Sequence, residues 1–137
     1  MKQSIKKMLS VILVTTTLFS CTKQHDDLTT ANSEVIQGTW KIESFTESSE
    51  NSTNDFIGFT FNFAGNGKLA ALKNGAATEG AWSTTNTRFT IDLGAKGTSN
   101  KLGNLTDEWL IVSKTDTKIT LKDDNVARNE VLVFSKN

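Results

Sequence analysis

Cysteine and histidine are almost absent from this sequence, and tyrosine is missing altogether. The 137 residues include one cysteine, Cys21, and one histidine, His25. A lone cysteine leaves no partner for a disulfide. A lone histidine outside the patterned part of the chain excludes a Ser-His-Asp arrangement or a cluster of histidine metal ligands in the fold. We therefore expect no catalytic residues, no metal site and no cofactor, and predict that the protein is not an enzyme.

A surplus of basic charge is also missing. The sequence carries 15 Lys and Arg residues against 15 Asp and Glu residues. Three of the basic residues, Lys2, Lys6 and Lys7, stand in the first twenty residues, where no acidic residue occurs. The chain after residue 20 therefore has a mild negative balance. Nucleic-acid binding depends on clustered Lys and Arg, so we exclude nucleic acid as a partner.

Long apolar runs are absent too, because the longest stretch covers only Met8 to Phe19 and includes three threonines. A membrane-spanning helix needs about 20 apolar residues, so this segment is too short to cross a bilayer. A basic start, a short apolar run and a small residue before a cleavage point are the parts of a secretory signal. We predict that residues 1–20 are a signal peptide.

The residues that follow the apolar run, Leu18-Phe19-Ser20-Cys21, resemble the lipobox of bacterial lipoproteins. The resemblance implies cleavage before Cys21 and attachment of diacylglycerol and a fatty acyl chain such as palmitate to that residue. Acylation anchors a protein to a membrane, since each buried methylene contributes about 0.8 kcal/mol. Thr22 is not the aspartate of an inner-membrane retention signal, and residues 23–27 are similar to the acidic stretch of surface lipoproteins in Bacteroidota. These features favour the outer membrane, at its periplasmic or cell-surface face.

The rest of the chain divides into a tether and one domain. Residues 21–35 are polar with little periodicity, which predicts a lipidated tether. Residues 36–137 have the length of one small domain with a single core. Within them, alternation of apolar residues predicts eight strands and no long helix, although a short helical turn can lie within 100–108. The predicted strands are 36–46, 56–64, 67–73, 77–84, 87–94, 106–114, 117–123 and 130–136.

The second predicted strand has the clearest pattern, because Ile57, Phe59, Phe61 and Phe63 fall on one face. Eight antiparallel strands with one apolar face each predict a closed barrel or a sandwich. The predicted connections after the second, fourth and sixth strands are tight, those after the first and fifth are long, and the one after the seventh is intermediate. In an up-and-down meander the tight turns therefore gather at one end, the floor, and the long loops at the other end, the mouth. This arrangement favours the barrel.

Three tryptophan motifs carry a family resemblance. Gly38-Thr39-Trp40 looks like the Gly-x-Trp signature of lipocalins, and Gly80-Ala81-Trp82 and Asp107-Glu108-Trp109 follow it. With the eight strands and the lipobox, the chain resembles the lipocalin-like domains of small Bacteroidota lipoproteins. The resemblance implies an all-β, eight-stranded antiparallel up-and-down barrel.

The topology places the ends of the first and last strands together at the floor. Lipocalins stack a basic side chain on the first tryptophan, and the resemblance assigns this role to Lys136 against Trp40. A cation–π contact of this kind contributes about 0.5–2 kcal/mol. Trp82 is expected at the floor as well, whereas Arg128 lies at the mouth. These residues have a structural role.

The mouth is the expected place for a ligand. Aromatic and cationic side chains near it suit a small hydrophobic molecule with an acidic head. The candidate ligand-binding residues are Phe45, Phe56, Lys73, Lys96, Lys101, Trp109 and Arg128. The alternative function is a filled barrel that docks an envelope protein or a polysaccharide through its long loops, with aromatics in the core and lysines in solvent.

Two pairs of adjacent carboxylates are candidate sites. Neighbouring residues on a strand point to opposite faces, so Asp107 and Glu108 are not expected to act together. Asp123 and Asp124 are adjacent to Asn125 and have the chemistry for Ca²⁺, but they lack the ligand spacing of a dedicated calcium loop. We predict a solvated hairpin there rather than a metal site.

Overall fold

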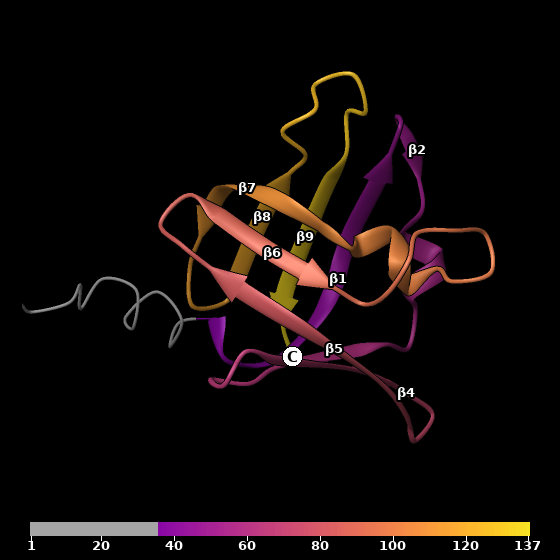
Figure 1. Cartoon of the computed structure of the whole chain (residues 1–137), viewed down its shortest axis with the longest axis vertical. Coiled ribbons are helices and arrows are strands. Elements are labelled where there is room, and N and C mark those ends of the chain that lie inside the picture. Colours follow the sequence, from indigo (N-terminus) through magenta and orange to yellow (C-terminus); the bar gives the residue numbers. More distant parts are fainter. Residues whose placement is uncertain (1–35) are drawn as a thin grey trace, which may run out of the picture.

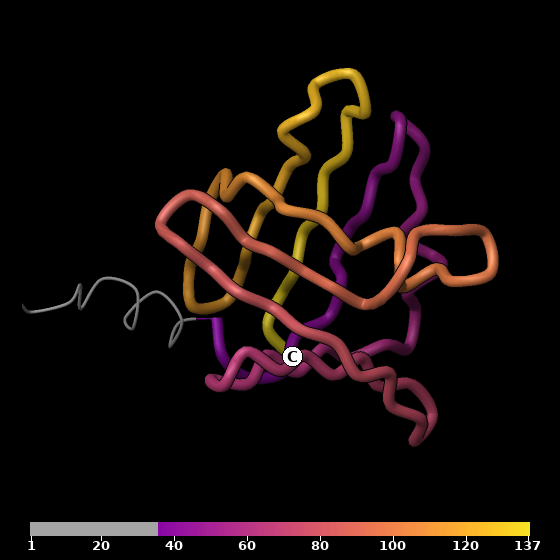
Figure 2. Tube along the Cα trace, in the orientation of Figure 1, coloured from indigo at the N-terminus to yellow at the C-terminus, as the bar shows by residue number. Residues whose placement is uncertain are grey.

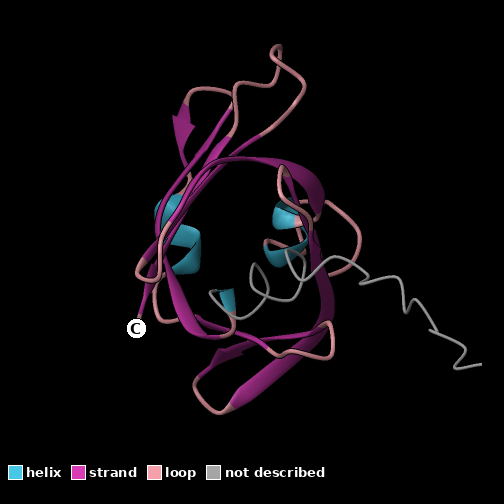
Figure 3. Cartoon of the chain, turned by 90° about the vertical axis from the view of Figure 1, so that its left-hand side faces the viewer, coloured by secondary structure: helices cyan, strands magenta, loops and turns pink. Residues whose placement is uncertain are grey.

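The computed structural model describes residues 36–137, and the predictions of a signal peptide, an acylated Cys21 and a polar tether lie outside this range. Eight strands follow one another as antiparallel neighbours, and the first also pairs with the last. The strands therefore close into a ring, which Figure 3 shows nearly end-on. The barrel strands are β1 (Gly38–Glu47), β3 (Thr60–Phe63), β4 (Lys68–Lys73), β5 (Ala76–Thr84), β6 (Arg88–Asp92), β7 (Asp107–Lys114), β8 (Lys118–Lys122) and β9 (Val131–Lys136).

The seam between β1 and β9 completes the barrel (Figure 1). Trp40 lies opposite Lys136 and Thr46 opposite Val131, with a register shift between Ile42 and Ser44. Because every barrel strand has a partner on both sides, no long edge is left open. The predicted all-β, eight-stranded up-and-down barrel is confirmed, and the sandwich alternative is wrong.

Side chains that alternate along the strands fill the interior. Phe63 is central, with ring centroids 5.5 Å from Phe134 and 5.4 Å from both Trp82 and Phe89, all with steeply inclined ring planes. Such edge-to-face pairs add about 0.5–1.5 kcal/mol each beyond the burial of apolar area. The core consists of Ile36, Trp40, Phe45, Phe56, Phe61, Phe63, Leu69, Ala71, Trp82, Phe89, Ile91, Leu93, Leu102, Leu105, Trp109, Ile119, Leu121, Leu132 and Phe134.

Tight connections at residues 64–67, 85–87 and 115–117 mark the floor, and the long connections 93–106 and 123–130 mark the mouth. The tube in Figure 2 shows the 123–130 loop and the β1–β2 hairpin projecting side by side. Backbone and side-chain hydrogen bonds join these two loops, from Ser48 N–H to the Arg128 carbonyl at 3.2 Å and from Asn129 to the Ser49 hydroxyl at 3.1 Å. Hydrogen bonds therefore join the β1–β2 hairpin and the 123–130 loop, which we call the rim of the mouth.

The second strand is shorter than predicted. Its first predicted residue, Phe56, ends a 3₁₀ helix, η1 (Thr53–Phe56), residues 57–58 form a turn, and strand β3 begins only at Thr60. Gly58 lies between them with a φ of +83°, a left-handed conformation that interrupts a strand. Ile57 is consequently 65% exposed and does not share the buried face of Phe61 and Phe63, so that part of the prediction was wrong.

Two further short elements lie at the mouth. Strand β2 (Glu50–Asn51) folds back on the end of β1, within a segment that was predicted as loop. The 3₁₀ helix η2 (Leu102–Leu105) falls in the region where a helical turn was expected. Its residues Leu102 and Leu105 are buried, so η2 covers the core at this end.

Candidate functional site

Two tryptophans close the barrel ends in the same way. The indole N–H of Trp40 donates to the carbonyl of Ile36 at 2.6 Å, and that of Trp109 donates to the carbonyl of Leu105 at 3.0 Å. In each case the acceptor belongs to a buried residue four positions earlier, just before the strand begins. Each tryptophan therefore fixes the segment that leads into its strand.

At the floor, Lys136 makes the contact with Trp40 that the topology and the lipocalin resemblance led us to expect. Lys136 Nζ lies 4.8 Å from the centroid of the Trp40 ring and donates to the carbonyl of Gln37 at 2.8 Å. Trp82 lies at the same end and donates from its indole N–H to the Ala64 carbonyl at 2.8 Å. The polar atoms of these floor side chains all have partners.

The aromatic residues predicted at the mouth lie together, but inside the core. The Phe45 ring centroid is 5.6 Å from that of Phe56 and 6.3 Å from that of Trp109, both in edge-to-face geometry. Phe45 and Trp109 are fully buried, and Phe56 is nearly so. These rings form a plug under the mouth.

The predicted mouth cations do not converge on one point. Lys73 Nζ lies over the ring of Phe59 at 4.7 Å. Lys101 pairs with Asp55 at 2.9 Å and so joins η2 to η1. Lys96 and Arg128 instead point to a group of carboxylates.

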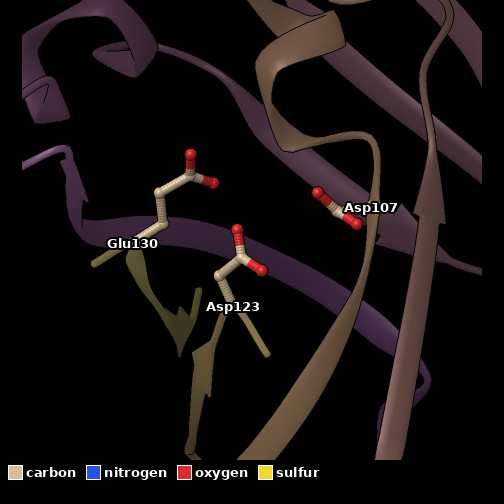
Figure 4. A group of neighbouring side chains, drawn as sticks. All are labelled: Asp107, Asp123 and Glu130. Carbon is tan, nitrogen blue, oxygen red and sulfur yellow. The ribbon is translucent and has the colours of Figure 1, made fainter. Parts of the chain in front are cut away.

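This carboxylate group was missed by the sequence analysis. Asp107 at the start of β7, Asp123 just after β8 and Glu130 just before β9 have carboxylate oxygens that all lie within 4.8 Å of one another. Figure 4 shows Asp123 and Glu130 side by side and Asp107 reaching toward them from across the mouth. Asp123 and Glu130 are both buried, so the prediction of a solvated hairpin at Asp123 was wrong. We call these three residues the carboxylate triad.

Two cations neutralise part of the triad. Arg128 lies 2.6 Å from Asp123 through Nε and 3.1 Å from Asp107 through a terminal nitrogen. Lys96 Nζ lies 2.7 Å from Asp107. No hydrogen bond reaches Glu130 Oε2 from any residue that the structure describes, although this oxygen is buried.

The pKa values of two triad members, Glu130 and Asp107, are shifted in opposite directions. Burial raises the pKa of Glu130 and outweighs the lowering effect of Lys96 and Arg128. Burial also acts to raise the pKa of Asp107, but the hydrogen bond from Lys96 and the charges of Lys96 and Arg128 outweigh it, so this pKa is lowered. Within the triad, nearby cations therefore offset the burial of the Asp107 charge but not that of the Glu130 charge.

Strand alternation explains why the triad was hidden in the sequence. Glu108 and Asp124, the neighbours of Asp107 and Asp123, point outward and share Arg88 at 3.2 and 2.8 Å. The two members of each adjacent acidic pair thus point in different directions, as expected for Asp107 and Glu108. Asp107 meets Asp123 in the triad, and Glu108 and Asp124 meet at Arg88. The signal that would have revealed the triad is the position of all three residues at mouth ends of β7, β8 and β9.

A hollow of about 160 Å³ adjoins the triad. It is smaller than the roughly 300 Å³ at the lower end of ordinary ligand pockets. Two triad members, Asp123 and Glu130, take part in its lining. The hollow is lined by Lys122, Asp123, Asn125, Val126, Asn129, Glu130 and Val131.

The fold is shared with proteins from Bacteroides. A DUF4847 family protein from Bacteroides vulgatus matches with a TM-score of 0.54 and 15% identity over 74% of this chain and 93% of that chain. A lipocalin-like protein from Bacteroides uniformis matches with a TM-score of 0.53 and 15% identity over 75% of this chain and 99% of that chain. No family model and no curated protein matches the sequence. The chain is similar to lipocalin-like barrels in fold.

Within residues 36–137, no helix has the length and apolar character required to cross a bilayer. Cys21, the predicted site of lipid attachment, precedes this range.

Proposed function

We propose that this protein is a lipid-anchored interaction module, which holds a lipocalin-like barrel at the outer membrane and docks an envelope protein or a polysaccharide through the mouth. The observation that carries this proposal is the aromatic plug. Phe45 and Trp109, the residues that a ligand entering the mouth would meet, are fully buried against each other and against Phe56. The side chains that a partner can reach at this end of the barrel are therefore those of the loops.

The rim loops have the properties of a docking surface. Hydrogen bonds between residues 48–49 and 128–129 hold two of them together, which lowers the entropy lost when a partner binds. Val126 is 89% exposed at the tip of the 123–130 loop, next to polar residues. An exposed apolar residue with a polar surround is common in contacts between proteins.

The direction of the chain agrees with an anchor on the other side. Strand β1 begins at the floor, so a lipid on Cys21 joins the barrel there through residues 21–35, and the mouth lies at the opposite end of β1. Such an anchor leaves the rim accessible, at either the periplasmic or the cell-surface face. Replacing Cys21 with serine is expected to release the protein from the membrane fraction, as measured by fractionation and by mass spectrometry of residue 21.

Photo-crosslinking in intact cells tests the docking surface. A photoreactive amino acid at position 126 in the mouth is expected to give a discrete cross-linked product. The same amino acid at position 116, in the exposed floor turn, is the matched control and should give none. Equal products from both positions, or none from either, would contradict the proposal.

The small-molecule function is tested separately with an apolar fluorescent probe. The intact barrel is expected not to bind the probe, because the rings of Phe45 and Trp109 occupy the mouth end of the interior. Replacing Phe45 with alanine removes a large buried ring and is expected to create a binding cavity. Stoichiometric binding by the unmodified protein would favour the alternative, a carrier of a small hydrophobic ligand with the mouth cations around its acidic head.

A further inference from the structure

We propose that the carboxylate triad, Asp107, Asp123 and Glu130, is a calcium site at the mouth of the barrel. Calcium in proteins is held by oxygen ligands, predominantly carboxylates, carbonyls and water. The triad supplies three carboxylates from three different strand ends, and the adjoining hollow has room for water. The site is independent of the proposed docking function, since its occupancy can be measured without a partner.

The spacing of the oxygen atoms fits one ion. Calcium–oxygen distances are about 2.3–2.6 Å, so two ligands on opposite sides of one ion are about 5 Å apart at most. One carboxylate oxygen from each triad residue lies within 4.8 Å of the corresponding oxygens of the other two. A single calcium ion can therefore contact all three residues with little movement of the backbone.

Glu130 is the observation that points to a ligand. It is only 6% exposed, its carboxylate is directed toward the other two members of the triad, and its Oε2 accepts no hydrogen bond from the described residues. A buried carboxylate without a partner is costly, because desolvation is not offset by new interactions. A cation in the triad supplies the missing interaction.

The balance of charge also favours a divalent ion. Three carboxylates face two monovalent cations, Lys96 and Arg128, which leaves one negative charge without a counterpart. Exchanging Arg128 for one divalent ion neutralises the group. The Arg128 side chain is 37% exposed and lies on the 123–130 loop, so it can move into solvent while Asp123 remains in place.

Calcium fits the site better than its common competitors. Magnesium requires a nearly ideal octahedron and gives up water reluctantly, whereas calcium accepts six to eight oxygen ligands in flexible geometry. Zinc prefers sulfur and nitrogen ligands, and the triad offers only oxygen. Water in the adjoining hollow, which Asn125 and Asn129 help to line, can complete the coordination.

Calorimetric titration of the purified full-length protein with CaCl₂, after removal of divalent ions with a chelator, tests the proposal. We expect one ion to bind per chain and the melting temperature to rise with calcium. Substituting residues that only support metal ligands lowers metal affinity by about 10–100-fold, so a loss of at least this size is expected for Glu130→Gln and Asp123→Asn. The absence of binding at millimolar calcium would overturn the proposal.

Two matched controls remove one negative charge each without touching the triad. Glu108→Gln and Asp124→Asn replace the neighbouring residues that point outward and pair with Arg88. Both are expected to bind calcium within about twofold of the unmodified protein, because their charges are exposed and screened by solvent. If these variants lose affinity as strongly as Glu130→Gln, binding reflects general surface charge and the triad site is wrong.

Arg128→Gln gives a test with the opposite sign. If Arg128 occupies the position of the ion, its removal is expected to raise calcium affinity, whereas any other substitution above lowers or preserves it. Circular dichroism shows whether each variant is folded before titration. Unchanged or weaker calcium binding by a folded Arg128→Gln variant would contradict displacement of the guanidinium and with it the proposed charge balance.

Discussion

The two ends of the barrel are built on the same plan and differ in how their polar groups are satisfied. Each end has a buried tryptophan that binds the carbonyl of a residue four positions earlier. At the floor, Lys136 lies on the Trp40 ring and donates to a backbone carbonyl. At the mouth, three carboxylates lie together at the ends of β7, β8 and β9. One of them, Glu130, has a buried oxygen that accepts no hydrogen bond from the described residues.

The comparison suggests that the floor serves the stability of the barrel and that the mouth serves binding. The floor is closed by short turns and satisfied contacts, which is what a stable structural end requires. The mouth has an equally well-packed aromatic plug beneath a rim with uncompensated charge. Unpartnered buried polar groups in a well-packed protein commonly mark a place where another molecule or ion binds. The predictions below test whether the two ends differ in this way.

Removing the tryptophan at either end has the largest expected effect. Trp40→Ala and Trp109→Ala each delete a fully buried ring and an indole hydrogen bond. We expect each to lower the free energy of unfolding by about 3–5 kcal/mol, the usual cost of such truncations. Urea denaturation measures both, with Val112→Ala, at an exposed position of β7, as the control. A loss below about 1 kcal/mol at one end only would show that this end is not held by its tryptophan.

Crowding at the mouth gives the next largest effect. A Cβ atom on Gly103, within η2, would lie 2.0 Å from the carbonyl oxygen of Ala95 and 2.6 Å from Asn100 Nδ2. Gly103→Ala is therefore expected to lower the free energy of unfolding by about 1–3 kcal/mol, as overpacking does. Gly97 lies in the same loop, and a Cβ there meets no atom within 4 Å, so Gly97→Ala is the matched control. Equal stability of the two variants, measured by thermal unfolding, would contradict close packing of η2.

Loss of the floor cation has a smaller expected effect. Lys136→Met keeps much of the aliphatic chain but removes the ammonium group over Trp40 and its hydrogen bond to Gln37. A cation–π contact contributes about 0.5–2 kcal/mol, so we expect a loss of stability in that range. Lys118→Met removes an exposed ion pair with Glu43 and serves as the control, with a smaller loss. Chemical denaturation that ranks Lys118→Met as the more harmful change would reject the role of Lys136.

The smallest effect is expected at the mouth, and it has the opposite sign. Burial raises the pKa of Glu130 in the folded protein, and Lys96, Arg128, Asp123 and Glu47 are the charged groups around it. The stability that Glu130 contributes is thus complete below its unfolded pKa, about 4.3, and is lost as the pH rises through its folded pKa.

Glu130→Gln retains the neutral form at every pH. In a chelator, its melting temperature relative to the unmodified protein is therefore expected to rise between acid and neutral pH. Asp124→Asn, which removes an exposed carboxylate paired with Arg88, provides the comparison and should not show this rise. A constant difference between Glu130→Gln and the unmodified protein across the range would mean that Glu130 is not poorly compensated.

The barrel could be predicted from the sequence because its inward residues are almost all apolar. Phe89 and Ile91, or Ile119 and Leu121, alternate with exposed or half-buried residues, and this pattern follows directly from strand geometry. Ile57 continued the same pattern but is exposed, since the backbone at Gly58 turns out of the strand. The alternation of apolar residues along the sequence gives no sign that the backbone turns at Gly58.

The triad was not predicted, because the carboxylates were compared with their neighbours along the chain and not across the strands. Asp107 and Asp123 were recognised only as members of adjacent pairs, and Glu130 stood within a predicted strand with no distinguishing signal. Their proximity arises when β7 pairs with β8 and β8 with β9, with all three residues at the same end. The residues were visible in the sequence, whereas their shared location was a property of the closed sheet.

The seam between β1 and β9 also affects how the chain folds. It pairs strands from opposite ends of the described chain, so its formation carries the largest loop-closure entropy of any pairing in the sheet. Proteins rich in such distant contacts fold slowly. Until the seam forms, β1 and β9 each expose an unpaired edge that can pair with a second molecule. The rate at which this seam closes therefore sets the time during which the folding chain is exposed to aggregation.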